Sequence, residues 1–185
     1  YNGLPKDPIT PLRGIREAVP GTRVLYAQGA DLAEKFPVLA VIPPRVTQSR
    51  SGQPGWTAEY FRTREIAGAP LFTRVDSAVD MNWFDGAPRG DMNPDDFAVR
   101  WTATLRAPAT GTYRIGVDGT VKCQVYLDDS LLTRSVYPSH DGEFPDPRMA
   151  QSQPLTLEQG KTYKLRVESE ETYGDAQIRV VWSAP

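Results

Sequence analysis

The sequence predicts an all-β protein whose main part is an antiparallel β-sandwich. Apolar and polar residues alternate in three consecutive runs, 99–105, 113–117 and 121–127, which is typical of strands with one buried face. The turns between the runs are short and rich in Pro, Gly and Asp, so the strands form a meander without an intervening helix. The 17 prolines and 15 glycines of the chain also suit a turn-rich sandwich better than a helical bundle.

The first thirty residues differ in pattern and predict a short helix followed by a strand. Thr10 can cap a helix over residues 11–18, which has a proline in its first turn and apolar side chains at Leu12 and Ile15. Pro20-Gly21 ends this helix, and residues 22–27 form a compact apolar run typical of a strand. One helix and one strand cannot form a core, so we interpret residues 1–30 as a stub and not as a domain.

A linker is predicted over residues 31–55. It contains Pro37, Pro43-Pro44 and Pro54-Gly55, with a Ser/Gly run at 49–52, and this composition favours an extended conformation. Residues 38–42 are apolar enough to lie as an edge strand on the sandwich or on a neighbouring domain. The predicted division is therefore 1–30 stub, 31–55 linker and 56–185 sandwich.

Several short motifs follow one another in order along the predicted strands. They are Ala58-Glu59-Tyr60-Phe61, Gly68-Ala69-Pro70-Leu71, Phe97-Ala98-Val99-Arg100-Trp101, Gly111-Thr112-Tyr113, Tyr126-Leu127-Asp128, Leu157 to Lys161 with Tyr163 to Val167, and Ile178 to Trp182. In this order they resemble the PA14 (protective-antigen) domain over about residues 56–182, with Asp129 where that family has Gly. The resemblance implies a β-sandwich of the kind found inside glycoside hydrolases, in carbohydrate-binding adhesins and in a bacterial toxin.

The stub carries a second resemblance. Residues 10–18 followed by 24–32 resemble the second α/β domain of glycoside hydrolase family 3, just ahead of the point where some members contain an inserted PA14 domain. This implies an accessory domain of a β-glucosidase-type hydrolase, which narrows the entrance to the host's active site and helps to set the length of glycoside accepted.

No catalytic residue is predicted in this chain, and whether it belongs to an enzyme rests on the resemblance. Cys123, the one cysteine, lies on the apolar face of a strand, where a small buried hydrophobe is the usual role. Carboxylate pairs such as Asp95-Asp96 and Asp128-Asp129 fit turn chemistry. The resemblance implies the same conclusion, because family 3 hydrolases take their nucleophile from an S-D-W motif in another domain, and this chain has none.

No metal or other cofactor is predicted either. One histidine and one distant cysteine do not supply a zinc site. Thr120 and Val121 stand where the adhesins of the family hold Ca²⁺ with two consecutive aspartates. The run from Asp91 to Asp95 begins like an EF-hand loop, but Asp96 replaces the required Gly and Thr102 the bidentate Glu.

Two long loops remain as candidate functional segments, residues 82–96 and 133–153. In the first we expect Trp83 to pack with Trp101 inside the sandwich. The second combines aromatic and hydrogen-bonding side chains, the two groups that sugar recognition uses. Its predicted substrate-binding residues are Tyr137, His140, Asp141, Phe144 and Arg148. The residues alone leave open whether Phe144 anchors the loop or contacts a ligand, and whether His140 is solvated, structural or ligand-binding.

Three functional hypotheses follow. The first is the accessory carbohydrate-recognition domain, with the host hydrolase domains and an oligosaccharide or glycoside as partners; the others are a free-standing carbohydrate-binding module and a structural or assembly module without a ligand. A net charge of −2 gives no field that would attract nucleic acid or an anionic membrane, and no stretch of 18 apolar residues is present. The compartment is unknown, with a periplasmic or extracellular location favoured.

Overall fold

The computed structural model describes residues 9–25, 39–135 and 149–185. Residues 1–38 and 39–185 form two separate units. In the first, the predicted helix is present as α1 (Pro11–Ala18), and the Thr10 hydroxyl accepts a hydrogen bond of 3.2 Å from the Arg13 amide. The predicted strand over 22–27 is wrong for its described part, because residues 22–25 are not a strand. A strand satisfies its backbone groups through a neighbour, and no described strand pairs with this segment.

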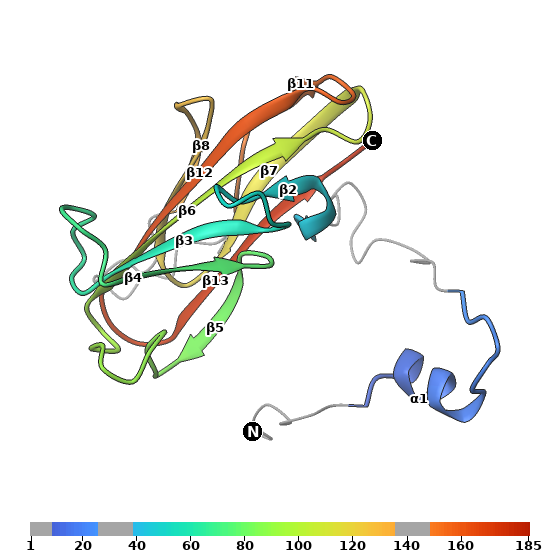
Figure 1. The fold of residues 1–185 in the computed structure, drawn as a ribbon, viewed down its shortest axis with the longest axis horizontal. Helices are drawn as coiled ribbons and strands as arrows, with labels where there is room; N and C mark the ends of the chain where they lie inside the picture. Colours follow the sequence, from blue (N-terminus) through green and yellow to red (C-terminus); the bar gives the residue numbers. More distant parts are fainter. Residues whose placement is uncertain (1–8, 26–38, 136–148) are drawn as a thin grey trace. The chain divides into compact units, whose positions relative to one another are not determined.

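Residues 39–185 form two antiparallel sheets, which confirms the predicted all-β sandwich (Figure 1). The seven-stranded sheet runs in the order β4 (Phe72–Asp76), β3 (Trp56–Phe61), β6 (Phe97–Arg106), β12 (Thr162–Glu171), β8 (Lys122–Leu127) and β9 (Ser130–Ser135), with β2 (Thr47–Gln48) also paired to β6. The six-stranded sheet runs in the order β1 (Ala40–Val41), β13 (Ala176–Ser183), β7 (Gly111–Gly119) and β10 (Met149–Gln151), with β11 (Leu155–Leu157) on β7 and β5 (Asp80–Phe84) on β13.

The core lies between the two sheets and contains large aromatic side chains. Trp56, Tyr60, Trp101 and Tyr113 are fully buried, as the alternation along their strands requires. Trp83 stacks on Trp101 with ring centroids 6.4 Å apart, which confirms the predicted packing of this pair. Cys123 is also buried, with 2% of its surface exposed, as predicted.

Three predicted segments differ from the structure at their boundaries. The predicted linker is too long at its C-terminal side, because β1, the short helix η1 (Pro44–Val46) and β2 all pack on the sandwich, with Ile42 and Val46 buried. The predicted loop 82–96 begins inside β5, and the predicted loop 133–153 includes the end of β9 and all of β10. Of these short strands, β1 lies within the apolar segment 38–42 and is the edge strand expected there, paired with β13 of the sandwich. Proline content and loop composition concealed the others, β2, β5 and β10, whose backbone groups find partners on β6, β13 and β7.

The sandwich has two ends with different connections. We call the end with segments 62–71, 85–96, 120–121 and 172–175 the loop end, and the end with turns 107–110, 128–129 and 158–161 the hairpin end. At the hairpin end, Asp128 and Asp129 have φ of 47° and 66°, the left-handed conformation that a two-residue hairpin turn requires and that Asp tolerates. The sequence-based interpretation of this pair as turn residues is therefore confirmed.

Candidate functional site

The five side chains predicted to bind substrate, Tyr137, His140, Asp141, Phe144 and Arg148, lie outside the described residues. The structure does describe the strands on either side of them. β9 ends at Ser135, which pairs with Cys123, and β10 begins at Met149, which pairs with Asp118. Both positions are near the loop end, so the chain leaves β9 and enters β10 on that side of the sandwich.

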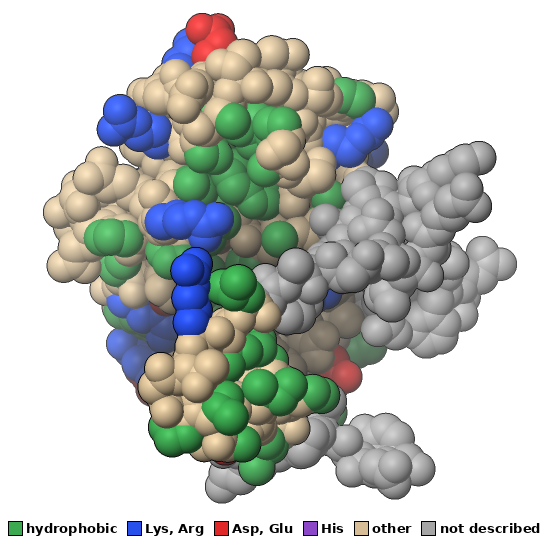
Figure 2. All heavy atoms as spheres, turned by 90° about the vertical axis from the view of Figure 1, so that its right-hand side faces the viewer, with side chains coloured by type: hydrophobic (Ala, Val, Ile, Leu, Met, Phe, Trp, Pro, Cys, Tyr) green, Lys and Arg blue, Asp and Glu red, His purple; other side chains and the backbone are tan. Residues whose placement is uncertain are grey.

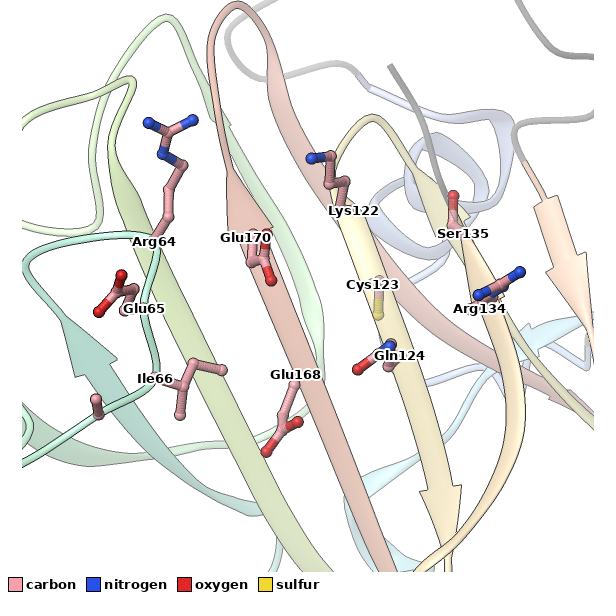
Figure 3. Close-up of a pocket in the computed structure, with 11 residues that line it drawn as sticks. Arg64, Glu65, Ile66, Lys122, Cys123, Gln124, Arg134, Ser135, Glu168 and Glu170 are labelled. Atoms are coloured by element: carbon pink, nitrogen blue, oxygen red, sulfur yellow. The ribbon is translucent and has the colours of Figure 1, made fainter. Parts of the chain in front are cut away.

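A polar hollow of about 620 Å³ lies beside β9 on the outer face of the seven-stranded sheet, and we call it the trough (Figure 3). Its floor is β12 and its walls are the segment that follows β3 and the strands β8 and β9. The side chains that define it are Glu168 and Glu170 on the floor, Arg64, Glu65 and Ile66 on one wall, and Lys122, Gln124 and Arg134 on the other.

Strand periodicity and register bring these side chains together. Alternate residues of β12 are buried in the core, so Glu168 and Glu170 face outward. Across the sheet, Glu170 is opposite Lys122 and Glu168 is opposite Gln124, which in turn is opposite Arg134. The floor and one wall are therefore built from consecutive outward positions of three neighbouring strands.

One row of the trough is held rigidly by its own ion pairs. Glu168 accepts a hydrogen bond of 3.1 Å from Arg100 and forms an ion pair of 2.6 Å with Arg166. The Arg166 guanidinium lies 3.8 Å from the ring centroid of Tyr126, whose hydroxyl donates to Gln124 Oε1 at 2.7 Å. These contacts fix Gln124 and Glu168 in place, because each partner is itself anchored.

The neighbouring groups are unpaired. The side chains of Lys122, Arg134, Glu65 and Glu170 form no hydrogen bond or ion pair with any residue that the structure describes. Ammonium and guanidinium groups donate hydrogen bonds, and carboxylates accept them. The trough therefore presents donors on its β8–β9 wall and acceptors on its floor and opposite wall, an arrangement that suits a ligand rich in hydroxyl groups, since a hydroxyl can both donate and accept.

The cysteine and the acidic segment that the sequence analysis considered as candidates have other surroundings in the structure. Burial raises the pKa of the Cys123 thiol well above its usual range, which keeps it unreactive. The acidic segment before β6 is divided among separate partners: Asp91 pairs with Arg89, Asp95 accepts from the Gly174 amide and Asp96 pairs with Arg64.

Across residues 9–25, 39–135 and 149–185, no group of three or more His, Cys, Asp or Glu side chains is arranged to hold a metal ion. The one described α-helix is too short and too polar to cross a membrane.

The sequence analysis did not identify the residues of the trough. Arg134 falls within the predicted loop 133–153, Lys122 lies in the predicted strand 121–127, and Glu170 lies beyond the predicted motif that ends at Val167. Charged residues at alternate positions of β8 and β12 were the available signal. That signal does not say which strands are neighbours, so the sequence alone could not place these charges on one surface.

The two packed antiparallel sheets place the protein among all-β sandwich domains, and the comparison with family models is more specific. The model of the PA14 domain matches residues 52–185. The chain belongs to the PA14 domain family, as its motifs predicted. The matched range begins just before β3 and leaves β1 and β2 outside it.

Three similar proteins carry names that bear on function. A β-glucosidase of Rhizobium radiobacter is 27% identical over 165 residues, which cover 88% of this chain and 18% of that protein. A β-glucosidase of Kluyveromyces marxianus, solved in complex with glucose, superposes with a TM-score of 0.67 at 18% identity, covering 96% of this chain and 22% of that one. The epithelial adhesin 9 A domain of Candida glabrata, solved in complex with Galβ1-4GlcNAc, gives a TM-score of 0.53 at 6% identity, covering 79% and 90%.

The two β-glucosidases are much longer than this chain. The chain spans about a fifth of the length of each. Similarity at this coverage relates the protein to one region of a β-glucosidase, and the likeness to the adhesin, at 6% identity, concerns the fold.

Proposed function

We propose that this protein is the accessory carbohydrate-recognition domain of a family 3 glycoside hydrolase of the β-glucosidase type. In this proposal the domain shapes the entrance to the host's active site and selects oligosaccharides by length. Tyr137, His140, Asp141, Phe144 and Arg148 would contact the substrate, and the trough would bind further sugar hydroxyls beside them.

The observation that carries the proposal is the set of unpaired donors and acceptors in the trough. These groups lie beside β9, the strand that leads into the predicted loop 133–153. Arg134 stands one residue before the end of β9, and Lys122 lies on the neighbouring strand. Sugar hydroxyls bind to such groups without a net charge on the ligand, and Ile66 supplies a small apolar surface for C–H groups. The β-glucosidase relatives, which this chain matches over 88% of its own length in one case, support the host that we propose.

The proposal is tested in the longer hydrolase with Lys122→Met and Arg134→Met combined. We expect the ratio of kcat/KM for cello-oligosaccharides to kcat/KM for a small aryl glucoside to change by a few-fold, about 1 kcal/mol, because the aryl substrate is too short to reach the trough. Lys161→Met is the matched control, since this exposed lysine at the hairpin end pairs with Glu158. An unchanged ratio would contradict the proposal.

Calorimetric titration of the 185-residue chain separates the alternatives. Binding of cello- or xylo-oligosaccharides by the isolated chain, with unchanged selectivity in the longer enzyme, would support a free-standing binding module. No binding together with unchanged selectivity would support a structural module.

A further inference from the structure

The hairpin end of the sandwich carries a second polar surface, which the proposed function does not use. Two adjoining hollows of about 280 and 320 Å³ share Arg45, Val46 and Arg106, and we call them together the arginine groove. Thr104 and Thr162 line one part of it, and Pro108 lines another. Figure 2, which faces this side of the molecule, shows Lys and Arg side chains around a hydrophobic patch of the sandwich.

The arginines of the groove lack the partners that other arginines of the sandwich have. Arg50, Arg74 and Arg100 each pair with a carboxylate. The side chains of Arg45 and Arg106 form no ion pair or hydrogen bond with a described residue, and none of the described residues that line the groove is acidic. A guanidinium group matches the geometry of a carboxylate with two parallel hydrogen bonds. The groove is therefore complementary to a carboxylate, unlike the trough, whose charges are mixed.

The position of the groove indicates the source of that carboxylate. Ala40, the first residue of β1, pairs with Trp182 near the end of β13, so the sandwich begins and finishes side by side. The start of β1 and the end of β13 both lie at the hairpin end. Pro185 packs closely on Gly111 at this end, since a Cβ atom added to Gly111 would lie 2.7 Å from Pro185 Cγ. Arg45 lies in η1, the short helix that comes after β1, and Arg106 ends β6 just before the turn that leads to Gly111. Any domain joined to both ends of the sandwich is held near this groove.

We propose that the arginine groove docks an acidic segment of the polypeptide domain that adjoins the sandwich, and so fixes how the sandwich is oriented on that domain. The identity of that domain as the hydrolase rests on the proposed function; the acidic character of the segment rests on the groove itself. Because the two parts are covalently joined, the effective concentration is in the millimolar range, and a contact that is weak between separate molecules is populated. Each proline at the groove adds rigid apolar surface beside the charges.

The first test uses the 185-residue chain and a hexaglutamate peptide as the probe, followed by NMR titration at low salt. We expect weak binding that shifts the Arg45 and Arg106 side-chain signals, and a loss of about fivefold or more in affinity for Arg45→Gln combined with Arg106→Gln. Arg62→Gln combined with Arg89→Gln is the matched control: it removes the same charge at the loop end, where both arginines pair with Asp91. About 1 M NaCl, where the screening length falls to about 3 Å, should abolish the binding.

The second test is calorimetric unfolding of the longer polypeptide, which needs no hydrolase activity. We expect the Arg45→Gln/Arg106→Gln variant to lower or separate the transition in which the sandwich and its neighbour unfold, while the control variant leaves it unchanged. Equal peptide affinity in the groove and control variants would overturn the proposal. So would inorganic phosphate that binds as tightly as the peptide, because the occupant would then be a small anion. These two results do not depend on whether the trough variants alter sugar selectivity. Failure of the docking proposal can therefore be distinguished from failure of the carbohydrate proposal.

Discussion

Among the residues that the structure describes, the two ends of the sandwich interior each contain one buried carboxylate, and the surroundings of the two differ. Asp76 lies at the end of β4 toward the hairpin end, and Glu171 lies at the end of β12 toward the loop end. Their exposed fractions are 6% and 2%. Burying a carboxylate is costly unless partners replace its water, so the contrast lies in how each charge is compensated.

Asp76 is fully partnered. It accepts hydrogen bonds from the Tyr60 hydroxyl at 2.7 Å, the Trp101 indole at 2.8 Å and Arg74 Nε at 2.6 Å. Arg74 also donates to the Tyr60 hydroxyl at 2.6 Å, which closes the network. Burial and the charge of Asp76 raise the pKa of Tyr60 well above its usual range, so its hydroxyl remains a donor.

Glu171 has no such cation. Its pKa is raised to about 7, chiefly by burial and to a smaller extent by the charges of Asp95 and Asp175, against the nearby backbone amides of Thr172 and Tyr173, which lower it. Burial alone therefore does not decide the role of an acidic side chain. The hairpin end uses its carboxylate to lock aromatic side chains, whereas the loop end keeps one that changes charge near neutral pH.

The largest effect is expected from Asp76→Ala. The Tyr60 hydroxyl, the Trp101 indole and Arg74 would all lose their common acceptor, which should lower the free energy of unfolding by about 3–5 kcal/mol in urea denaturation. Asp91→Ala serves as the control, because its ion pair with Arg89 is exposed to solvent and should contribute little to stability. Similar losses in the two variants would show that the network around Asp76 adds little.

The second prediction concerns Glu171→Gln and the dependence of folding stability on pH. In the unfolded chain this glutamate releases its proton near its ordinary value of 4.5, but in the folded protein it retains the proton up to about pH 7. The folded state therefore binds more protons between these values, so stability falls as pH rises from about 4.5 to 7, by about 2 kcal/mol.

The glutamine variant should lose this dependence and gain in melting temperature over the wild type at pH 8. Glu170→Gln is the matched control, because Glu170 faces solvent on the same strand. A gain of the same size in both variants would contradict a special environment at Glu171.

The contrast between these two acids also shows which features of the structure the sequence could predict and which it could not. The alternation of apolar residues predicted the sandwich and the buried Cys123, and the resemblance to the PA14 family predicted the packing of Trp83 on Trp101. It could not predict that Asp76 meets Tyr60 and Trp101, because those contacts depend on pairing between strands far apart in the chain. The trough was missed for the same reason. The strand predicted at 22–27 failed because local composition does not supply a partner strand.

A smaller effect is expected from Phe144→Ala, which concerns the predicted loop beyond the described residues. If this aromatic side chain contacts the second sugar, kcat/KM for disaccharides relative to a small aryl glucoside should change by a few-fold, about 1 kcal/mol, in the longer enzyme. The melting temperature of the isolated chain should barely change. Equal losses on all substrates, or a large loss of stability, would instead assign Phe144 to packing.

The smallest effect is expected from deletion of residues 1–30. None of the residues of α1 is buried, so the helix contributes little apolar burial to offset its ordering entropy. The melting transition of the remaining chain, followed by circular dichroism, should shift by less than about 2 °C. A larger fall would show that the first unit stabilises the sandwich.

The pairing of β1 with β13 has a consequence for how the protein folds. These strands are close to opposite ends of the described sandwich in sequence, and β13 lies between β1 and β7 in its sheet. During synthesis the six-stranded sheet therefore cannot close until β13 leaves the ribosome. Until then the apolar faces of β3 and β6 in the other sheet are not fully covered. Such long-range pairing slows folding and prolongs the exposure of unpaired strand edges. We expect stalled nascent chains to become resistant to protease only when β13 has emerged, so the emergence of β13 is the step that commits the sandwich to fold.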